Sequence, residues 1–343
     1  MDFVSAYLFG LAAGTDFQNN IGLRQQILHA YHRRKPYDFY FQELPTFTSL
    51  AQALRIPIIP KWRNIANQTL DVWGLALCES AERHLASTDP ENEPAVYKQL
   101  KQSMNRRNAM EDCANTDQKH LELACEVIDH LTAGFETTAV GLTYLFWELS
   151  RHPGLQRELR QELLTLSPQM VYQPLNSAVS FPLPKTIDAL PLLQAVIMET
   201  LRLHAPIPGM QPRELPTQTT IAGYRNIPAG VRVNAQAYSL HRNRNVFPDP
   251  ESWVPQRWLK EPGSPELMEM RRWFWAFGSG GRMCIGSNLA LQEMKLVTAA
   301  VYTNFSSTIV DDDGIEEIDA YTVKPKSDKL ILKFENARGI KEE

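Results

Sequence analysis

Residues 277–286 read Phe-Gly-Ser-Gly-Gly-Arg-Met-Cys-Ile-Gly, and a run with apolar residues at helical spacing follows them. Four glycines, one arginine and one cysteine therefore fall within ten residues. Cys284 stands where a glycine loop passes into a helix, and the N–H groups of a helix start favour an anionic sulfur. Glycines let a backbone or a flat ligand approach without Cβ clashes. Arg282 is placed to pair with acidic groups of whatever the sulfur binds. The stretch therefore predicts a thiolate ligand site.

The pattern FxxGxRxCxG is filled completely in this stretch. Its fixed places are held by Phe277, Gly280, Arg282, Cys284 and Gly286. The pattern resembles the haem-binding loop of the cytochrome P450 family, in which the cysteine thiolate is the proximal ligand of the haem iron. The resemblance implies haem b as cofactor, with Cys284 as the metal ligand and the other four residues among those that hold the haem. The alternative, a buried structural cysteine in a glycine turn, would suit an isolated cysteine better than a filled pattern.

The composition is that of an ordinary globular protein. The chain has 343 residues, 43% of them hydrophobic, and its net charge of −4 gives no electrostatic case for nucleic-acid binding. The four cysteines show no CxxC pair, which suggests a reducing compartment with neither a disulfide framework nor a zinc site. The apolar N-terminus lacks a basic region and is broken by Asp2, Gly10 and Asp16, so we expect neither a signal peptide nor a membrane span.

A second motif lies in the longest predicted helix, which runs from about Asp117 to Arg151 without a proline. Residues 131–149 are apolar on nearly every face, which indicates a buried helix. Within it, residues 133–138 read Ala-Gly-Phe-Glu-Thr-Thr. A glycine, a glutamate and two threonines in a buried helix work against helix propensity and against burial. Such local conflict is typical of functional sites.

This stretch is similar to the central-helix motif of the P450 family, where the helix crosses the oxygen-binding face of the haem. By resemblance, Ala133 and Gly134 belong to the haem site and leave room for O₂. Glu136 and Thr137 are then the catalytic residues that help to deliver protons during oxygen activation. Taken alone, the same residues would also fit a helix with a hydrogen-bonded threonine and a solvated glutamate.

Glu199 and Arg202 lie three residues apart on a helix predicted to open at residues 188–191, with Asp188 near its N-cap. From spacing alone they are an exposed ion pair of small energy. The P450 family carries a Glu-x-x-Arg pair here, joined by an arginine from a later Pro-x-Arg loop, and residues 255–257 match that loop. The resemblance implies a buried structural network of Glu199, Arg202 and Arg257 that locks the loop of Cys284.

Between these motifs, residues 211–237 carry β-branched runs and turn residues, which predict a small β-region. Arg213 falls where the family places a basic residue for a haem propionate, and the alternative is a surface arginine at a strand edge. His241 is expected to serve in packing or hydrogen bonding rather than as an iron ligand.

Further elements are expected around the motifs. Helices are predicted at residues 23–32, 64–85, 154–166 and 285–304, a loop at 36–46, a non-helical stretch at 56–60, and a closing strand pair at 321–323 and 330–334.

The expected fold class is mainly α with small β-sheets, in a P450-like fold that is N-terminally truncated. Residues 1–343 are expected to form one domain, with a helical front part at 1–119 and a haem-binding core at 120–335. Family members are usually longer and carry a Trp-x-x-x-Arg motif that is not found here before residue 110. The residues around the Pro-x-Arg loop are most similar to the microsomal, and within it the fungal, branch of the family.

The resemblance implies a haem-thiolate monooxygenase that inserts one oxygen atom from O₂ into a small apolar organic substrate of secondary-metabolite type. Electrons would come from NADPH-cytochrome P450 reductase or another separate donor, because the chain has no flavin or nicotinamide fingerprint. The alternative is a truncated, catalytically inactive haem-binding remnant. Isomerase or dehydratase chemistry is disfavoured because Glu136 and Thr137 are both in place.

Arg271, Arg272, Arg282 and Lys295 are interpreted either as a basic docking face for the electron donor or as solvated charge with one propionate partner. A form with an anchor is expected on the cytoplasmic side of the endoplasmic reticulum, and this chain alone is expected to be soluble or peripheral.

Overall fold

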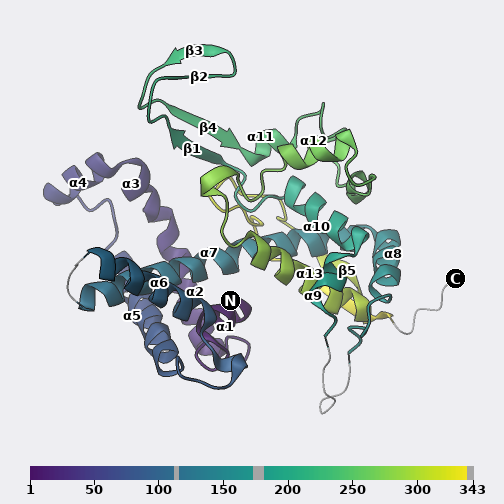
Figure 1. Cartoon of the computed structure of the whole chain (residues 1–343), viewed down its shortest axis with the longest axis horizontal. Helices are drawn as coiled ribbons and strands as arrows, with labels where there is room; N and C mark the ends of the chain where they lie inside the picture. The colour runs from purple at the N-terminus through teal and green to yellow at the C-terminus, as the bar shows by residue number, and fades with distance from the viewer. Residues whose placement is uncertain (112–115, 173–180, 338–343) are drawn as a thin grey trace. The chain divides into compact units, whose positions relative to one another are not determined.

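The computed structural model describes residues 1–111, 116–172 and 181–337, with the side chains of residues 107–111 and 116–117 left out. In these residues the protein is mainly helical, with three small two-stranded antiparallel sheets (Figure 1). The predicted fold class, mainly α with small β-sheets, is therefore confirmed. By its internal contacts the chain divides into two compact units, Met1–Phe135 and Glu136–Glu343. The prediction of a single domain stays a prediction.

The described residues of the first unit form helices and the segments that connect them, and no strand. Its elements are α1 (Asp2–Phe9), α2 (Ile21–Arg34), η1 (Lys35–Tyr37), α3 (Asp38–Glu43), α4 (Pro45–Ala53), α5 (Trp62–Arg83), η2 (Pro90–Asn92), α6 (Ala95–Glu111) and the first part of α7 (Thr116–Arg151). Apolar residues of α1, α5, α6 and α7 share one core, which includes Val4, Phe9, Leu77, Tyr97, Val127 and Leu131. The predicted helices at residues 23–32 and 64–85 are confirmed, and so is the non-helical stretch at 56–60.

The predicted loop at residues 36–46 is wrong, because η1, α3 and the start of α4 occupy it. The two prolines that suggested a loop stand in the first turns of η1 and α4. At those positions the missing N–H of proline has no partner to lose, and its fixed φ suits a helix. The prolines therefore start helices here instead of breaking one.

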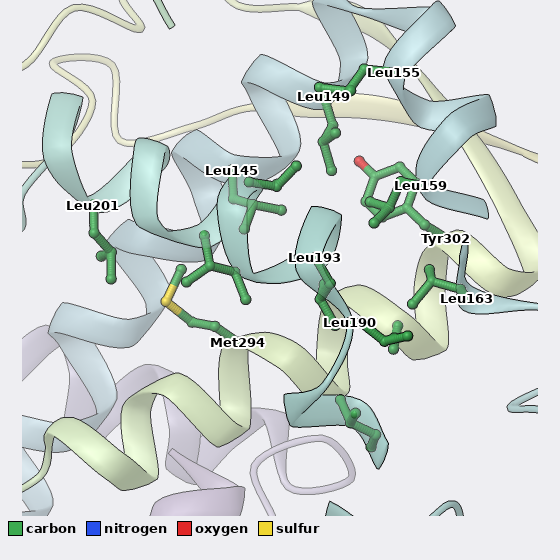
Figure 2. Packing of buried hydrophobic residues seen from close by; sticks show 14 of the residues in the cluster. Leu145, Leu149, Leu155, Leu159, Leu163, Leu190, Leu193, Leu201, Met294 and Tyr302 are labelled. Atoms are coloured by element: carbon green, nitrogen blue, oxygen red, sulfur yellow. The ribbon is translucent and has the colours of Figure 1, made fainter. Parts of the chain in front are cut away.

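The second unit holds most of the motifs. Its helices are the rest of α7, α8 (Pro153–Leu163), α9 (Pro184–Asp188), α10 (Pro191–Leu203), α11 (Ala237–His241), η3 (Pro255–Trp258), α12 (Pro265–Trp273), η4 (Gly280–Arg282) and α13 (Ser287–Asn304). Leucines of α7, α8 and α10 pack with Met294 and Tyr302 of α13 in one core (Figure 2). On α8 the buried leucines 155, 159 and 163 recur every four residues, which places them on one face of the helix.

The start of α10 differs from the prediction that Asp188 lies near its N-cap. Asp188 is the last residue of α9, and its carboxylate accepts hydrogen bonds from Lys295 Nζ and Gln292 Nε2, each at 2.7 Å. The free N–H groups of Leu192 and Leu193 are instead bound by the two carboxylate oxygens of Glu162, both at 2.8 Å. A carboxylate from α8 therefore caps α10, and no local sequence pattern reveals it.

The strands form three antiparallel pairs. β1 (Met210–Glu214) pairs with β4 (Arg232–Gln236), β2 (Thr219–Ile221) with β3 (Tyr224–Ile227), and β5 (Phe305–Asp311) with β6 (Ile331–Asn336). The hairpin β2–β3 extends beyond the β1–β4 pair (Figure 1). The β-region predicted at residues 211–237 is confirmed.

Of the two strands predicted to form the closing pair, one is not a strand in the structure. β6 lies at the second predicted strand, but it pairs with β5, and residues 321–323 are not a strand. Val323 instead packs against Val140 and Tyr144 of α7, which explains its apolar character. Within the described ranges, no helix has both the length and the apolarity needed to cross a bilayer.

A buried histidine ties three segments of the second unit together. His204, at the end of α10, lies between two carboxylates: its Nε2 is 3.2 Å from Glu148 Oε1 of α7, and its Nδ1 is 2.7 Å from Glu317 Oε1 of the segment after β5. Its ring stacks on Tyr144 at 4.4 Å. A neutral imidazole has only one N–H, so two acceptors favour the doubly protonated ring. Burial disfavours this charge, but the hydrogen bonds to both glutamates outweigh burial and raise the pKa of His204.

We expect this contact to make stability depend on pH. Because the folded-state pKa is raised, its contribution is full below the unfolded histidine pKa of about 6.5 and is lost as pH rises through the folded value. The loss amounts to about 1.4 kcal/mol for each unit of pKa elevation. The measurement is the free energy of unfolding of the wild type and of His204→Gln in denaturant at a series of pH values. The difference between the two should shrink as pH rises.

Glu316→Gln is the matched control for this experiment. Glu316 is exposed, neighbours Glu317 in sequence, and faces Lys326 at 3.4 Å. The Glu316→Gln variant should keep the pH dependence of stability of the wild type, whereas Glu317→Gln should reduce that dependence. A difference between wild type and His204→Gln that stays constant with pH would contradict the assignment.

Candidate functional site

The glycine loop before α13 is closed by its own backbone. Gly278 N donates to Trp275 O at 2.9 Å, and Cys284 N donates to Phe277 O at 2.8 Å. Gly278 and Gly280 have φ values of +67° and +73°, which residues with a Cβ atom rarely adopt. The loop therefore folds back on itself. Cys284 lies at its end, two residues before Gly286, which is the N-cap of α13.

The thiol of Cys284 is exposed, in contrast to the buried thiol of Cys78. Burial raises the pKa of Cys78 to about 12, so that thiol stays protonated. Cys125 is also free and exposed, and Cys113 lies outside the described residues. Among the described cysteines, Cys284 is the one that combines exposure with a helix start.

The surface around this thiol fits a large flat ligand such as haem. The side chains next to it, Met283 and Ile285, are 54% and 84% exposed. A Cβ added at Gly280 or Gly281 would meet no atom within 4 Å, so the loop leaves open space. Exposed apolar side chains beside an accessible thiol mark a binding surface rather than a packed core.

Two cationic side chains and one buried donor accompany this surface. Arg282 and Arg213 are both exposed. Arg213 lies on β1 two residues after Gln211, whose Oε1 would be 2.9 Å from a Cβ placed on Gly278, so β1 runs beside the loop. The indole Nε1 of Trp275 is buried without a partner among the described residues. These groups suit the carboxylates of a haem, and the residues present fit the cofactor.

The loop is anchored through its first residues. Phe277 packs against the core of the second unit, with its ring 6.4 Å from that of Phe274. Phe274 in turn contacts His241 and Trp258. The aromatic side chains before the glycines therefore hold the base of the loop while its tip stays exposed.

Glu199 is the centre of a buried charge network. The carboxylate is completely buried, and the described part of the chain brings five N–H donors to it, each at 2.9 Å. They are Nε and Nη2 of Arg202, Nε of Arg257, the backbone N of Val254 and Nε1 of Trp258. The three residues that the family resemblance joined as a network therefore meet, and two neutral donors join them. So many donors keep a buried carboxylate charged at low cost.

The two arginines extend the network into the chain between α11 and η3. Arg202, also completely buried, donates to the backbone oxygens of His241, Pro250 and Ser252 at 2.7–3.0 Å. Arg257 donates to Pro248 O at 2.9 Å. Irregular backbone in this region therefore finds its hydrogen-bond partners in two guanidinium groups.

The motif on α7 is divided between the two units. Ala133 and Gly134 belong to the first, where a Cβ on Gly134 would lie 2.9 Å from Val4 Cγ1, so this glycine permits close packing with α1. Glu136 and Thr137 are half-buried at the start of the second unit. The side chains of Ala133 and Ala139 are exposed, so the prediction that residues 131–149 form a buried helix is wrong at these two positions. An alanine has little apolar area, and its exposure costs little.

A glutamate that the sequence did not single out lies against this motif. Thr138 is buried and hydrogen-bonds to the side chain of Glu293 on α13, and burial raises the pKa of Glu293. The contact fastens α7 to the helix that follows Cys284. Glu293 stands in an ordinary amphipathic pattern, so no sequence signal distinguished it.

The four basic residues grouped as a docking face do not share one environment. Arg271 and Arg272 on α12 are exposed, as is Arg282. Lys295 is only 5% exposed and its Nζ lies 2.7 Å from Asp188 Oδ1. Including Lys295 in a basic surface was therefore wrong, because its ammonium group is already paired inside the protein.

Comparison with known proteins gives the family of the chain. A family model described as Cytochrome P450 matches residues 38–332. The chain is 35% identical over 217 residues to "Cytochrome P450 monooxygenase tazI" of Aspergillus terreus, which covers 62% of this chain and 41% of that protein. It is 28% identical over 327 residues to "Cytochrome P450 monooxygenase orf2" of Aspergillus niger, covering 92% and 57%.

A mammalian protein gives a similar match. "Cytochrome P450 11B2, mitochondrial" of Mus musculus is 34% identical over 202 residues, 59% of this chain and 37% of that protein. The chain thus spans between 37% and 57% of the length of these relatives. With most of its residues matched by the family model, the chain belongs to the cytochrome P450 family.

Proposed function

We propose that this chain is the haem-binding part of a haem-thiolate monooxygenase. The reaction is the insertion of one oxygen atom from O₂ into a small apolar organic substrate of secondary-metabolite type. The observation that carries the proposal is the exposed Cys284 thiol, which stands at the start of α13 on a loop closed by the Phe277 O to Cys284 N bond. Similarity to two fungal proteins named as monooxygenases supports the reaction class.

The residues around the loop have separate roles in this proposal. Cys284 is the thiolate ligand of haem b, and haem b, when bound, supplies the activation of O₂. Arg282 and Arg213 pair with its carboxylates. Phe277, Gly280 and Gly286 shape the loop, and Gly278 and Gly280 alone supply the left-handed backbone that it needs. Ala133 and Gly134 keep side-chain volume small on α7.

Glu136 and Thr137 are proposed to hold and pass protons along α7. A carboxylate and a hydroxyl on adjacent residues offer one strong acceptor and one group that both donates and accepts. The neighbouring Thr138 is hydrogen-bonded to Glu293, so Thr138 is assigned a structural role. The network of Glu199, Arg202 and Arg257 is proposed to keep the cysteine loop in place.

The electron donor is proposed to be NADPH-cytochrome P450 reductase or another redox partner protein. It would bind at the exposed Arg271, Arg272 and Arg282. An anchored form of the protein is proposed to lie at the endoplasmic reticulum.

The proposal is tested on the chain purified from cells supplied with a haem precursor. We expect the reduced, CO-bound protein to show the red-shifted Soret band of a thiolate-ligated haem. With NADPH, the reductase, isotopically labelled O₂ and naphthalene as an apolar probe, we expect one labelled oxygen atom in the product. The readout is mass spectrometry of the extracted probe.

Two outcomes separate the alternatives. A Soret band without labelled product favours the inactive haem-binding remnant over the monooxygenase. Absence of the thiolate band in haem-loaded chain contradicts haem-thiolate binding itself.

A further inference from the structure

His241 is a completely buried side chain at the end of α11. Its ring stacks on Phe274 with centroids 5.4 Å apart and an angle of 17° between the planes. The ring of Phe247 lies nearly perpendicular to the His241 ring, with centroids 6.4 Å apart. A polar ring enclosed by two phenylalanines must have partners for both of its nitrogens, because an unpaired buried nitrogen is costly.

Both nitrogens of His241 are paired with backbone groups. Trp275 N donates to Nε2 at 2.7 Å, so Nε2 is an acceptor and the ring proton sits on Nδ1. Nδ1 therefore donates to Arg202 O, also at 2.7 Å. Arg202 returns a bond from its side chain, with Nη1 donating to His241 O at 3.0 Å. The two residues are thus held to each other in both directions.

These bonds complete a path from the charge network to the cysteine. Glu199 holds the side chain of Arg202, and the backbone of Arg202 holds His241. His241 holds the backbone N of Trp275, nine residues before Cys284 in sequence. Trp275 O then binds Gly278 N, and Phe277 O binds Cys284 N. Each link is a hydrogen bond of 2.7–2.9 Å.

The ring is neutral near neutral pH. Burial lowers the pKa of His241 to about 3, and the nearby positive charges of Arg202 and Arg242 act in the same direction. A neutral ring keeps one donor and one acceptor, which is the arrangement that the two backbone partners require. His241 is therefore suited to hold a geometry and not to carry protons.

We propose that His241 is a positioning residue that transmits the rigidity of the Glu199 network to the loop of Cys284 by holding the backbone N–H of Trp275. The consequence for the haem ligand rests on the function proposed above. The hydrogen-bonded link itself does not, since it is made by the chain alone. Without the acceptor at Nε2, the start of the loop loses a side-chain hydrogen bond that joins it to the network.

The test replaces His241 in two ways. His241→Phe keeps a flat ring between Phe274 and Phe247 but offers neither donor nor acceptor. His241→Gln offers one donor and one acceptor on a single flat amide. Hydrogen exchange of the Gly278 and Cys284 amides is followed by mass spectrometry in the full chain without haem. We expect His241→Phe to speed this exchange about tenfold or more, as for a lost buried hydrogen bond, and His241→Gln to recover most of the protection.

Phe247→Leu is the control for general loss of packing. Phe247 is completely buried against His241 but contributes no hydrogen bond to the path. We expect it to lower the denaturation midpoint while leaving loop exchange close to the wild-type rate. The inference is overturned if the loop exchanges at the wild-type rate in His241→Phe. It is also overturned if His241→Gln or Phe247→Leu loosens the loop as much as His241→Phe does.

The absorbance spectrum of the haem-loaded protein is a second, independent measurement. In His241→Phe we expect a larger share of the reduced, CO-bound haem to absorb at the shorter wavelength of a haem without thiolate, with His241→Gln close to wild type. If the wild type lacks the thiolate band, the proposed function fails, and the exchange experiment still decides whether His241 positions the loop.

Discussion

Replacing Cys284 by alanine is expected to abolish the red-shifted Soret band of the reduced, CO-bound protein. The sulfur is the only group of residues 277–286 that can bind iron as a soft anion, and alanine offers no ligand in its place. The thiol is exposed, so its loss removes no core packing. The haem-free variant should therefore keep its stability within about 0.5 kcal/mol of wild type. The measurements are the CO difference spectrum and a denaturant titration.

Cys125→Ser is the matched control, because Cys125 is the other exposed free thiol among the described residues. It should keep the spectrum of the wild type. A thiolate band that survives in Cys284→Ala, or that disappears in Cys125→Ser, would remove the assignment of the iron ligand.

Substituting glutamine for Glu199 is expected to cost the largest amount of stability, about 3–5 kcal/mol. The carboxylate balances two buried guanidinium groups and accepts all five of the hydrogen bonds described for it. An amide removes the negative charge and turns an N–H₂ group toward N–H donors, so both arginines keep their charge without a partner. The free energy of unfolding in denaturant measures the effect, and haem content should fall with it.

The exposed pair on α12 is a suitable comparison. Arg272 and Glu269 have the same three-residue spacing as Arg202 and Glu199, but their groups are 3.7 Å apart with side chains 80% and 47% exposed. Arg272→Gln should change stability by less than about 1 kcal/mol. If Glu199→Gln lowers the free energy of unfolding no more than Arg272→Gln does, the network does not stabilise the fold as its geometry implies.

Much of the architecture was readable from local sequence. The α7 helix, the β-region and the helix after Cys284 follow from periodicity and from breakers, which act over a few residues. The errors fall where the local signal is ambiguous. Pro36 and Pro45 suggested a loop but start helices, and the apolar run at 321–323 packs against α7 instead of pairing as a strand.

The candidate site shows the same division. The cysteine pattern pointed to a ligand site by itself, because its glycines, arginine and sulfur act within ten residues. Spacing alone left Glu199 and Arg202 as an exposed pair, and only the resemblance made them a buried network. Their burial and the approach of Trp258 and Val254 depend on segments more than fifty residues away.

Sequence by itself determined which residues are candidates for the chemistry: a sulfur at a helix start, glycines with freedom at φ, and a charge pair one helical turn apart. Tertiary structure alone decided what those groups meet. It paired Lys295 with Asp188, placed His204 between two glutamates, and joined Arg202 to Trp275 through His241. The physical reason is range. Propensity and backbone geometry act between neighbours in the chain, whereas burial and charge pairing depend on which distant segments the fold brings together.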